Sequence, residues 1–311
     1  MSIRVASTAF ATLAVAAAAW ANGPTGAAKF GVVSQGVLVP GVFYSSAQDT
    51  SAVGVTSLCP SAEVYWAFAD QNDQVLDRGR FHLPQAQTRA FVLAQELGTE
   101  AAGRFGTLAF VADANGDGEL RTDDAPCLVA EAFHANLASQ DAVYIPVWPF
   151  NASDIRGLPM LPPPPDGIEH LSALDPNMLT TLHSGIVDPP GPGSNLVMAR
   201  YSITGEDSTQ LVVWSADDLS GSYQVDVSHA NGTVGSVTLQ LTHPHLNVID
   251  VGSIPGFPAN FTNGLLAAGI PDDADGDYVD LHFDGTGLAV YTVIHSPALG
   301  AAQTILATAG Q

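Results

Sequence analysis

Residues 64–73 read VYWAFADQND, and this short segment indicates the fold class. Val64, Trp66 and Phe68 alternate with Tyr65 and alanines, and the polar residues that follow are typical of a turn. In a strand, successive side chains point to opposite faces of the sheet, so this alternation predicts a strand with one buried face.

A second segment with the same alternation lies in the C-terminal part of the chain. Tyr223, Val225 and Val227 alternate with polar residues, and Asn231-Gly232 follows, a dipeptide that favours a hairpin turn. The chain has 30 Gly and 21 Pro residues, and this composition favours many short strands over helical bundles. The sequence therefore predicts an all-β fold with antiparallel strands.

Similar segments recur in the same order in the two parts of the chain. The matched ranges are 64–68 with 223–227, 81–84 with 241–244, 91–93 with 248–251, 105–111 with 280–283, and 142–147 with 289–293. This order predicts two tandem antiparallel β-sandwich modules that arose by a degenerate duplication. Two unrelated sandwiches with ordinary strand patterning are the alternative. Each part has the length and turn spacing of an immunoglobulin-like or fibronectin-like sandwich.

The first 21 residues are predicted to be a signal peptide. Arg4 supplies the positive start, residues 9–19 form an apolar run, and Ala19-Trp20-Ala21 resembles a cleavage site. The apolar run is shorter than the roughly 20 residues that a spanning helix needs. We therefore expect an exported chain, periplasmic, extracellular or at the cell surface, with no membrane insertion.

Residues 158–194 are predicted to link a module at 22–157 to a module at 195–311. Four consecutive prolines stand at 162–165, and a second stretch rich in Pro and Gly stands at 188–194. Proline holds the backbone extended and cannot donate to a β-ladder, which is typical of a semi-rigid spacer. The apolar spacing over 170–186 favours a short helix within this linker.

The charge balance excludes some classes of partner. Nine Lys and Arg residues stand against 31 Asp and Glu residues, a formal net charge of -22 at pH 7. Binding to nucleic acid or to an anionic membrane requires clustered cations, so neither partner is expected. Cations and protein or polysaccharide surfaces remain as candidate partners.

Two cysteines, Cys59 and Cys127, are the only pair in the chain. In an oxidising compartment a single pair is expected to form a disulfide, which would stabilise the fold by about 4 kcal/mol on a chain-entropy estimate. The pair lies inside the predicted first module and supports that module as one folding unit.

One acidic segment carries a recognisable binding motif. Residues 113–124 read DANGDGELRTDD and resemble the calcium loop of EF-hand proteins and, more closely, that of dockerin-type repeats. The resemblance implies calcium ligands at Asp113, Asn115, Asp117 and Asp124 and at the carbonyl of Glu119. Arg121 and the final aspartate depart from the EF-hand pattern. A solvated acidic turn is the alternative.

A second acidic segment, residues 272–280, repeats part of this pattern. The candidate calcium ligands are Asp273, Asp275, Asp277 and Asp280, but Tyr278 stands where the loop glycine would be. Acidic turns between strands are common in so acidic a chain, so this site is the weaker candidate.

Catalytic motifs are scarce. The chain has no G-x-S-x-G elbow, no H-E-x-x-H and no Gly-rich phosphate loop. His243 and His245, with His229 or Asp250, could form a zinc or copper site, although paired histidines on a strand are as often surface residues. A Ser-His-Asp triad is a matter of spatial arrangement that the sequence alone does not test.

Aromatic side chains suggest one further kind of site. A platform on which a sugar could stack would draw on Trp66, Trp148, Trp214, Tyr44, Tyr65 and Tyr144. Aromatic residues on alternating strand faces more often belong to the core.

The sequence thus favours a non-enzymatic exported protein that serves adhesion or surface, matrix or envelope assembly and has calcium-stabilised loops. A carbohydrate-binding accessory protein is the first alternative. A secreted hydrolase or metalloenzyme built around His243 and His245 is the second.

Overall fold

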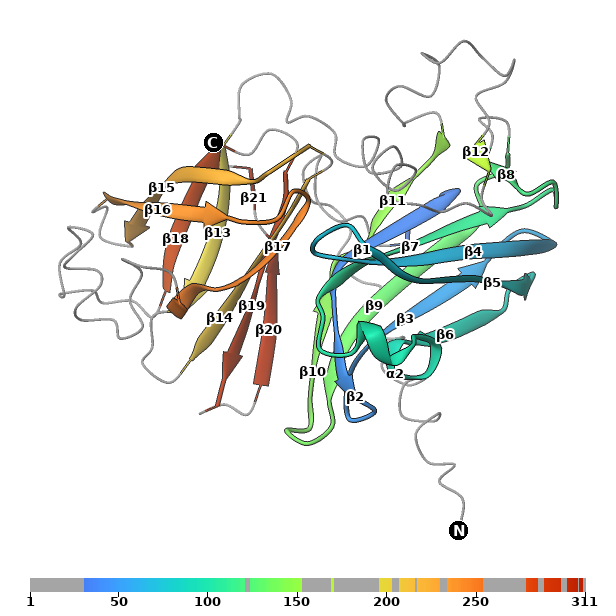
Figure 1. The fold of residues 1–311 in the computed structure, drawn as a ribbon, viewed down its shortest axis with the longest axis horizontal. Helices are drawn as coiled ribbons and strands as arrows, with labels where there is room; N and C mark the ends of the chain where they lie inside the picture. The colour runs from blue at the N-terminus through green and yellow to red at the C-terminus, as the bar shows by residue number, and fades with distance from the viewer. Residues whose placement is uncertain are drawn as a thin grey trace.

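The fold is mostly antiparallel β-sheet (Figure 1). In this computed structural model the described residues are 31–120, 124–152, 169–170, 196–202, 207–215, 217–229, 234–253, 278–284, 288–297, 301–306 and 308–309. The predicted signal peptide and most of the predicted linker lie outside them. Among the described residues the helices are short, and none is long and apolar enough to cross a membrane.

Residues up to 150 form two sheets. Sheet 1 has the order β11-β1-β7-β4-β5, and sheet 2 has the order β6-β3-β9-β10 with β2 also beside β3. The elements are β1 Gly36–Val42, β2 Tyr44–Ser46, β3 Asp49–Ser57, β4 Ser61–Asp70, β5 Val75–Pro84, β6 Thr88–Val92, α2 Leu93–Glu96, η1 Thr99–Ala101, β7 Gly106–Asp113, β8 Glu119–Leu120, β9 Leu128–Asn136, β10 Asp141–Ile145 and β11 Trp148–Phe150.

Residues from 196 onward form two further sheets. Sheet 3 has the order β16-β15-β18-β13-β21, and sheet 4 has the order β17-β14-β19-β20. The elements are β13 Leu196–Ser202, β14 Ser208–Ser215, β15 Gly221–His229, β16 Val234–Leu241, β17 Leu246–Asp250, η4 Val251–Ser253, β18 Tyr278–Asp284, β19 Leu288–Ser296, β20 Ala301–Leu306 and β21 Thr308–Ala309. We call residues 31–152 the first half and residues 196–309 the second half.

The two halves share one strand order. Sheet 3 repeats sheet 1 strand for strand, from β21 in place of β11 to β16 in place of β5. Sheet 4 repeats sheet 2 in the same way, and a short helical turn follows both β6 and β17. All pairings within these four sheets are antiparallel. The predicted all-β, antiparallel class is confirmed, and the shared order is what a duplication produces.

The topology corrects one detail of the predicted repeat. Residues 289–293 lie in β19, whose counterpart is β9, whereas residues 142–145 lie in β10, whose counterpart is β20. The sequence of β9, LVAEAFHAN, contains a glutamate and a histidine among its apolar residues. It therefore shows little similarity to the more apolar β19, and the match between these two strands was missed.

The strand order also differs from that of immunoglobulin domains. In those domains the first two strands share a sheet. Here β1 belongs to sheet 1 and β3 to sheet 2, and their counterparts β13 and β14 are separated likewise.

The predicted helix of the linker begins where the structure places a strand. Glu169–His170 forms β12, which pairs with β8 at Glu169↔Leu120 and His170↔Glu119. Residues 171–186 lie outside the described residues.

The core of the first half lies between its two sheets. Phe91 from sheet 2 is fully buried and meets Trp66 at 4.9 Å and Phe110 at 5.2 Å, centroid to centroid, both of which belong to sheet 1. Edge-on contacts of this kind add to the stabilisation from burial. The residues that alternate in the sequence at 64–68 therefore help to fill this core.

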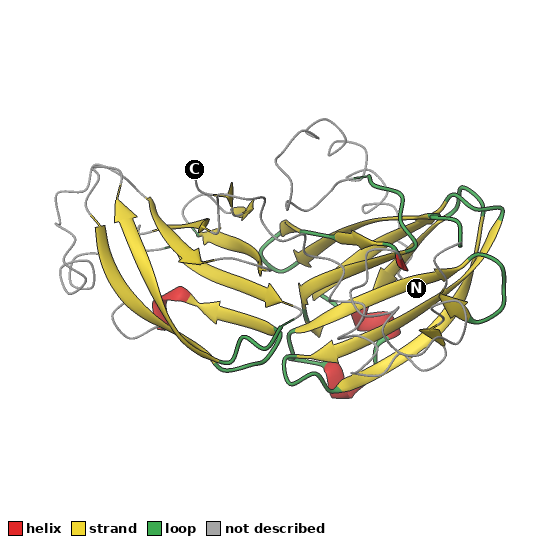
Figure 2. Ribbon diagram, turned by 90° about the horizontal axis from the view of Figure 1, so that it is seen from above, coloured by secondary structure: helices red, strands yellow, loops and turns green. Residues whose placement is uncertain are grey.

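Figure 2 shows the two halves side by side, and the central residues of β14 and β19 in sheet 4 are buried on both faces. In β14, residues 211–215 are all buried, and Val212 and Trp214 belong to the same hydrophobic cluster as the core of the first half. The Tyr291 hydroxyl from β19 donates to the Pro40 carbonyl of β1 at 2.9 Å. The two halves are thus joined by a packed junction as well as by the chain.

Candidate functional site

The acidic loop that follows β7 is organised around one buried aspartate. The Asp113 carboxylate is 2% exposed and accepts hydrogen bonds from the backbone N–H of Gly116 at 2.6 Å and of Gly118 at 2.8 Å. Both glycines have φ of +81°, a left-handed conformation that other residues rarely adopt. The glycines therefore let the chain turn back so that its N–H groups face the Asp113 carboxylate.

The next two alternate residues continue this arrangement. The Asn115 Oδ1 atom accepts from the N–H of Asp117, and the Asp117 Oδ1 atom accepts from the N–H of Glu119, both at 3.0 Å. Side-chain oxygens of Asn and Asp commonly close turns on an N–H two residues ahead. Oxygens at positions 113, 115 and 117 are thereby held along one turn of the loop.

The far end of the loop returns to the same place. The Asn115 Nδ2 atom donates to Asp117 at 3.1 Å and to Asp124 at 2.9 Å, so two carboxylates approach a single amide nitrogen. Asp124 is 8% exposed, and its carbonyl accepts from the Gln35 side chain at 2.6 Å. The structure therefore brings Asn115, Asp117 and Asp124 together, while the Asp113 carboxylate is occupied by the backbone of the turn.

The fifth predicted residue, Glu119, begins β8 and is paired through its backbone with β12. Residues 121–123 lie outside the described residues. Within the described part of the chain, His, Cys, Asp and Glu side chains form no group of three or more that could hold a metal ion. The oxygens of the loop currently accept hydrogen bonds from the loop itself.

The second acidic segment occupies a different place in the repeat. Its residues 272–277 lie outside the described residues, and Asp280 lies within β18, opposite Arg200 and Ser228. The first segment follows β7, whereas the second precedes β18, the counterpart of β7. The two acidic segments are therefore not equivalent positions of one repeated loop.

His243 and His245, predicted as candidate metal ligands, lie at the junction of the two halves. The Nδ1 atom of His243 is 3.2 Å from the Asn72 Oδ1 atom, and the Nε2 atom of His245 is 3.6 Å from the Asp73 carboxylate. Burial raises the pKa of Asp73, and the opposing effect of His245 only partly offsets it. These histidines contact the turn between β4 and β5, and Gln71 of the same turn donates to the Leu246 carbonyl at 3.3 Å.

A serine, a histidine and an aspartate do meet in the first half. His134 lies 3.2 Å from the Ser51 Oγ atom through Nδ1 and 3.0 Å from the Asp49 Oδ1 atom through Nε2. Ser51 has no exposed surface, and its Oγ atom accepts from the Phe43 N–H at 2.9 Å. A nucleophile must reach its substrate, so this buried serine has a structural role in pairing β3 with β9.

The candidate stacking residues belong mainly to the core. Five of the six are buried: Trp66, Trp148, Trp214, Tyr44 and Tyr65. The structure therefore does not present these five as a surface platform for a sugar.

Cys59 and Cys127 are neighbours but remain free thiols, so the expected disulfide is not formed in the structure. The Leu58 N–H donates to the Cys127 carbonyl at 2.8 Å, and the two thiols share a hydrogen bond. Burial raises the pKa of Cys127 to about 12. Oxidation proceeds through the thiolate, so burial of the protonated Cys127 thiol disfavours oxidation of the folded chain.

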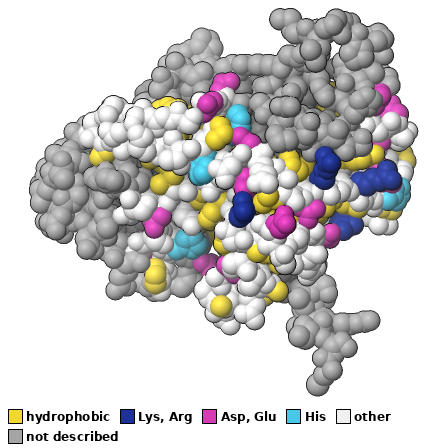
Figure 3. Space-filling view, viewed as in Figure 1, with side chains coloured by type: hydrophobic (Ala, Val, Ile, Leu, Met, Phe, Trp, Pro, Cys, Tyr) yellow, Lys and Arg dark blue, Asp and Glu magenta, His cyan; other side chains and the backbone are white. Residues whose placement is uncertain are grey.

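Basic side chains of the described residues are mixed with acidic ones. On the face in Figure 3, the Arg side chains of the described residues lie over the first half with Asp and Glu among them. Arg89 contacts Glu96 at 2.7 Å, and Arg104 contacts Asp70 at 2.6 Å.

Comparisons with known proteins leave the family open. No family model matches the chain, and no curated protein matches it. Among solved structures, a Momordica charantia 7S globulin is 8% identical with a TM-score of 0.19, over 85% of this chain and 73% of that one. An anti-sigma factor domain-containing protein is 8% identical with a TM-score of 0.19, over 88% and 82%. A Bacteroides uniformis β-glucuronidase is 10% identical with a TM-score of 0.14, over 84% and 24%. Scores this low carry no information on family or function.

Proposed function

We propose that this chain is an exported, non-enzymatic structural protein that serves adhesion or surface, matrix or envelope assembly and binds calcium through residues 113–124. The observation that carries the proposal is the geometry of that loop. A buried Asp113 holds the turn, the side-chain oxygens at positions 113, 115 and 117 accept N–H groups of the loop, and Asn115 reaches Asp124.

The residues of the loop suit a hard cation. Calcium takes six to eight oxygen ligands, and side-chain oxygens of Asp113, Asn115, Asp117 and Asp124 with the Glu119 carbonyl would supply them. The Asn115 Nδ2 atom donates to the carboxylates of Asp117 and Asp124. We propose that a bound cation would replace this amide group between the two carboxylates. A calcium ion would neutralise these charges far more strongly than a neutral amide does.

Binding to the folded loop would stabilise the whole protein. An ion that binds only the folded state stabilises it by mass action, by about 2.7 kcal/mol at 100 times the dissociation constant. The segment at 272–280 is proposed as a second calcium candidate. It is the weaker one, because Tyr278 stands where the turn of a calcium loop would need a glycine.

A structural role is further supported by how the candidate catalytic groups are used. Ser51 is buried, and His243 and His245 contact the turn between β4 and β5. These contacts favour the structural proposal over a metalloenzyme built around His243 and His245. Most of the aromatic residues on which the carbohydrate alternative depends are buried in the core.

Thermal unfolding with and without calcium tests the proposal. Calcium should raise the melting temperature and EDTA should lower it, because the ion binds only the folded loop. In Asp113→Ala, the rise in melting temperature that calcium causes should disappear. Asp226→Asn, which removes an exposed carboxylate on β15, should retain that rise. Identical melting curves of the wild-type protein in calcium and in EDTA would refute the calcium site.

A further inference from the structure

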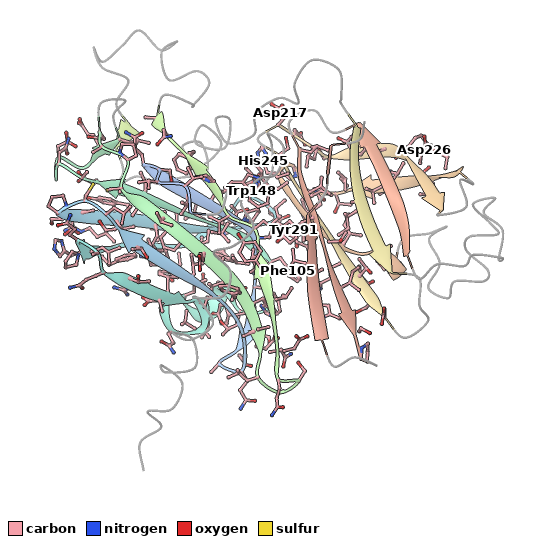
Figure 4. All side chains as sticks on the ribbon, turned by 180° about the vertical axis from the view of Figure 1, so that it is seen from behind. Phe105, Trp148, Asp217, Asp226, His245 and Tyr291 are labelled. Atoms are coloured by element: carbon pink, nitrogen blue, oxygen red, sulfur yellow. The ribbon has the colours of Figure 1, made fainter. Side chains whose placement is uncertain are left out.

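A cavity of about 320 Å³ lies where the two halves meet. Residues from β3, β9 and β10 line it on one side, and residues from β14 and β19 line it on the other. Figure 4 shows Phe105 and Tyr291, which both line the cavity, near the boundary between the halves. Ligand sites in proteins often lie between domains, and this volume is at the lower end of their usual range.

One part of the wall is aromatic and apolar. Phe43 and Phe105 stack with their centroids 4.6 Å apart and an interplanar angle of 28°, and both are only partly buried. Val143 and Val212 extend this wall from opposite halves. Aromatic faces of this kind attract cations through the ring quadrupole.

The polar part of the wall is acidic. Asp49 and Asp141 line the cavity with His134 and His295, and the residues that line it include no lysine or arginine. His134 contacts Asp49 at 3.0 Å, and His295 lies 4.0 Å from Asp141. These two carboxylates lie on β3 and β10.

The environment of His134 favours its neutral form. Burial lowers the pKa of His134, against the opposing effect of Asp49, and the nearby His295 lowers it further. The lining thus holds two carboxylates, a histidine that burial shifts toward its neutral form, and no lysine or arginine.

We propose that this cavity binds a small organic cation, such as an alkylammonium. The ammonium group would lie toward Asp49 and Asp141, and its carbon atoms would pack on Phe43 and Phe105. A bare metal ion suits the site less, because the described residues form no group of three metal-binding side chains and much of the wall is apolar. The net charge of -22 would favour the approach of a cation.

Calorimetric titration of the full chain at pH 7.5 and low ionic strength tests the charge preference. The probe is n-butylammonium chloride, with 1-butanol and sodium butyrate as neutral and anionic compounds of similar size. We expect the ammonium salt to bind and the other two to give no binding. Absence of ammonium binding, or equal binding of 1-butanol, would overturn the proposal. Binding of glucose in place of the ammonium would overturn it in favour of a sugar site.

Variants test whether binding occurs in this cavity. Asp141→Asn should weaken ammonium binding about fivefold, because it removes one of two carboxylates from a partly buried site. Asp226→Asn removes the same charge from β15, far from the cavity in Figure 4, and should change the affinity less than about twofold. Equal weakening by the two variants would mean that only the overall charge acts, and would contradict the site.

A second variant and a pH series complete the test. Phe105→Leu keeps an apolar side chain but removes the aromatic face, and should weaken ammonium binding about threefold. Lowering the pH from 7.5 to 5 should also weaken binding, since protonation of His134 places positive charge beside Asp49. An affinity that neither Phe105→Leu nor the pH change reduces would refute the assignment, even if Asp141→Asn failed to fold.

Discussion

The two halves have the same strand order and bury different surfaces. In β3 of the first half, Gly54 and Thr56 are only partly buried, so the strand keeps one face partly open. In its counterpart β14, Val212 and Trp214 are buried against the first half. The difference shows that the shared topology does not decide which sheet docks. The side chains on each strand determine which sheet docks, and β14 carries larger apolar side chains than β3.

A second difference lies in the loops after equivalent strands. Residues 114–127 separate β7 from β9, whereas only residues 285–287 separate β18 from β19. The acidic loop is thus an extension present in one half alone. If the acidic loop binds calcium as proposed, the repeated strands form the scaffold and this extension supplies the calcium ligands.

The largest effect should come from the docking face of β14. Trp214→Ala removes a fully buried indole and leaves a cavity at the junction, so it should lower the free energy of unfolding by about 3–5 kcal/mol. Urea unfolding would measure it. Leu58→Ala, at a side chain that is 46% exposed, should cost less than about 0.5 kcal/mol. A similar small cost for Trp214→Ala would mean that the halves are held together by the chain alone.

A matched pair of glycines measures the junction more finely. Gly41 has φ of +78°, and an added Cβ would come within 2.3 Å of the Tyr291 hydroxyl oxygen. Gly103 has φ of +76°, and nothing lies within 4 Å of an added Cβ. Both alanine variants share the backbone strain, but only Gly41→Ala disturbs the docked β19. We expect Gly41→Ala to cost about 1–3 kcal/mol more than Gly103→Ala in urea unfolding. Equal costs in the free energy of unfolding would indicate that the Tyr291 side chain can move away from Gly41 without destabilising the contact between the halves.

The smallest effect concerns His134, which lies near the end of β9. Burial lowers the pKa of His134, so the unfolded chain takes up a proton first as the pH falls below about 6.5. The folded state should therefore lose stability from about pH 6.5 downward until the lowered pKa is passed. His134→Gln should reduce this slope. Denaturant unfolding at several pH values would show it, and an unchanged slope in His134→Gln would contradict the assignment.

The sequence predicted the strands well where their pattern was local. Alternation at Val64, Trp66 and Phe68 correctly predicted a strand, because a strand places successive side chains on opposite faces. The predicted single buried face was wrong, since residues 64–70 are all buried and both faces of β4 are covered. The match between the halves was correct for most strands and wrong for β9, where Glu131 and His134 interrupt the apolar pattern.

The junction was not predicted, although it left a signal. Residues 211–214 read LVVW without alternation, and a continuous apolar run is typical of a strand buried on both faces. His243 and His245 suggested a metal site because sequence spacing does not reveal that Asn72 and Asp73 lie opposite them. The cavity could not be foreseen either, since its acidic and aromatic residues come from segments far apart in the chain.

Calcium titration of the metal-free protein tests the central proposal most directly. The loop at 113–124 should take up calcium with a dissociation constant of about 10⁻⁴ to 10⁻³ M, as extracellular calcium modules do. Asp113→Asn should abolish that uptake, and Asp275→Asn should preserve it. Calorimetry that detects no calcium binding up to about 10 mM, or binding that survives Asp113→Asn unchanged, would contradict the account.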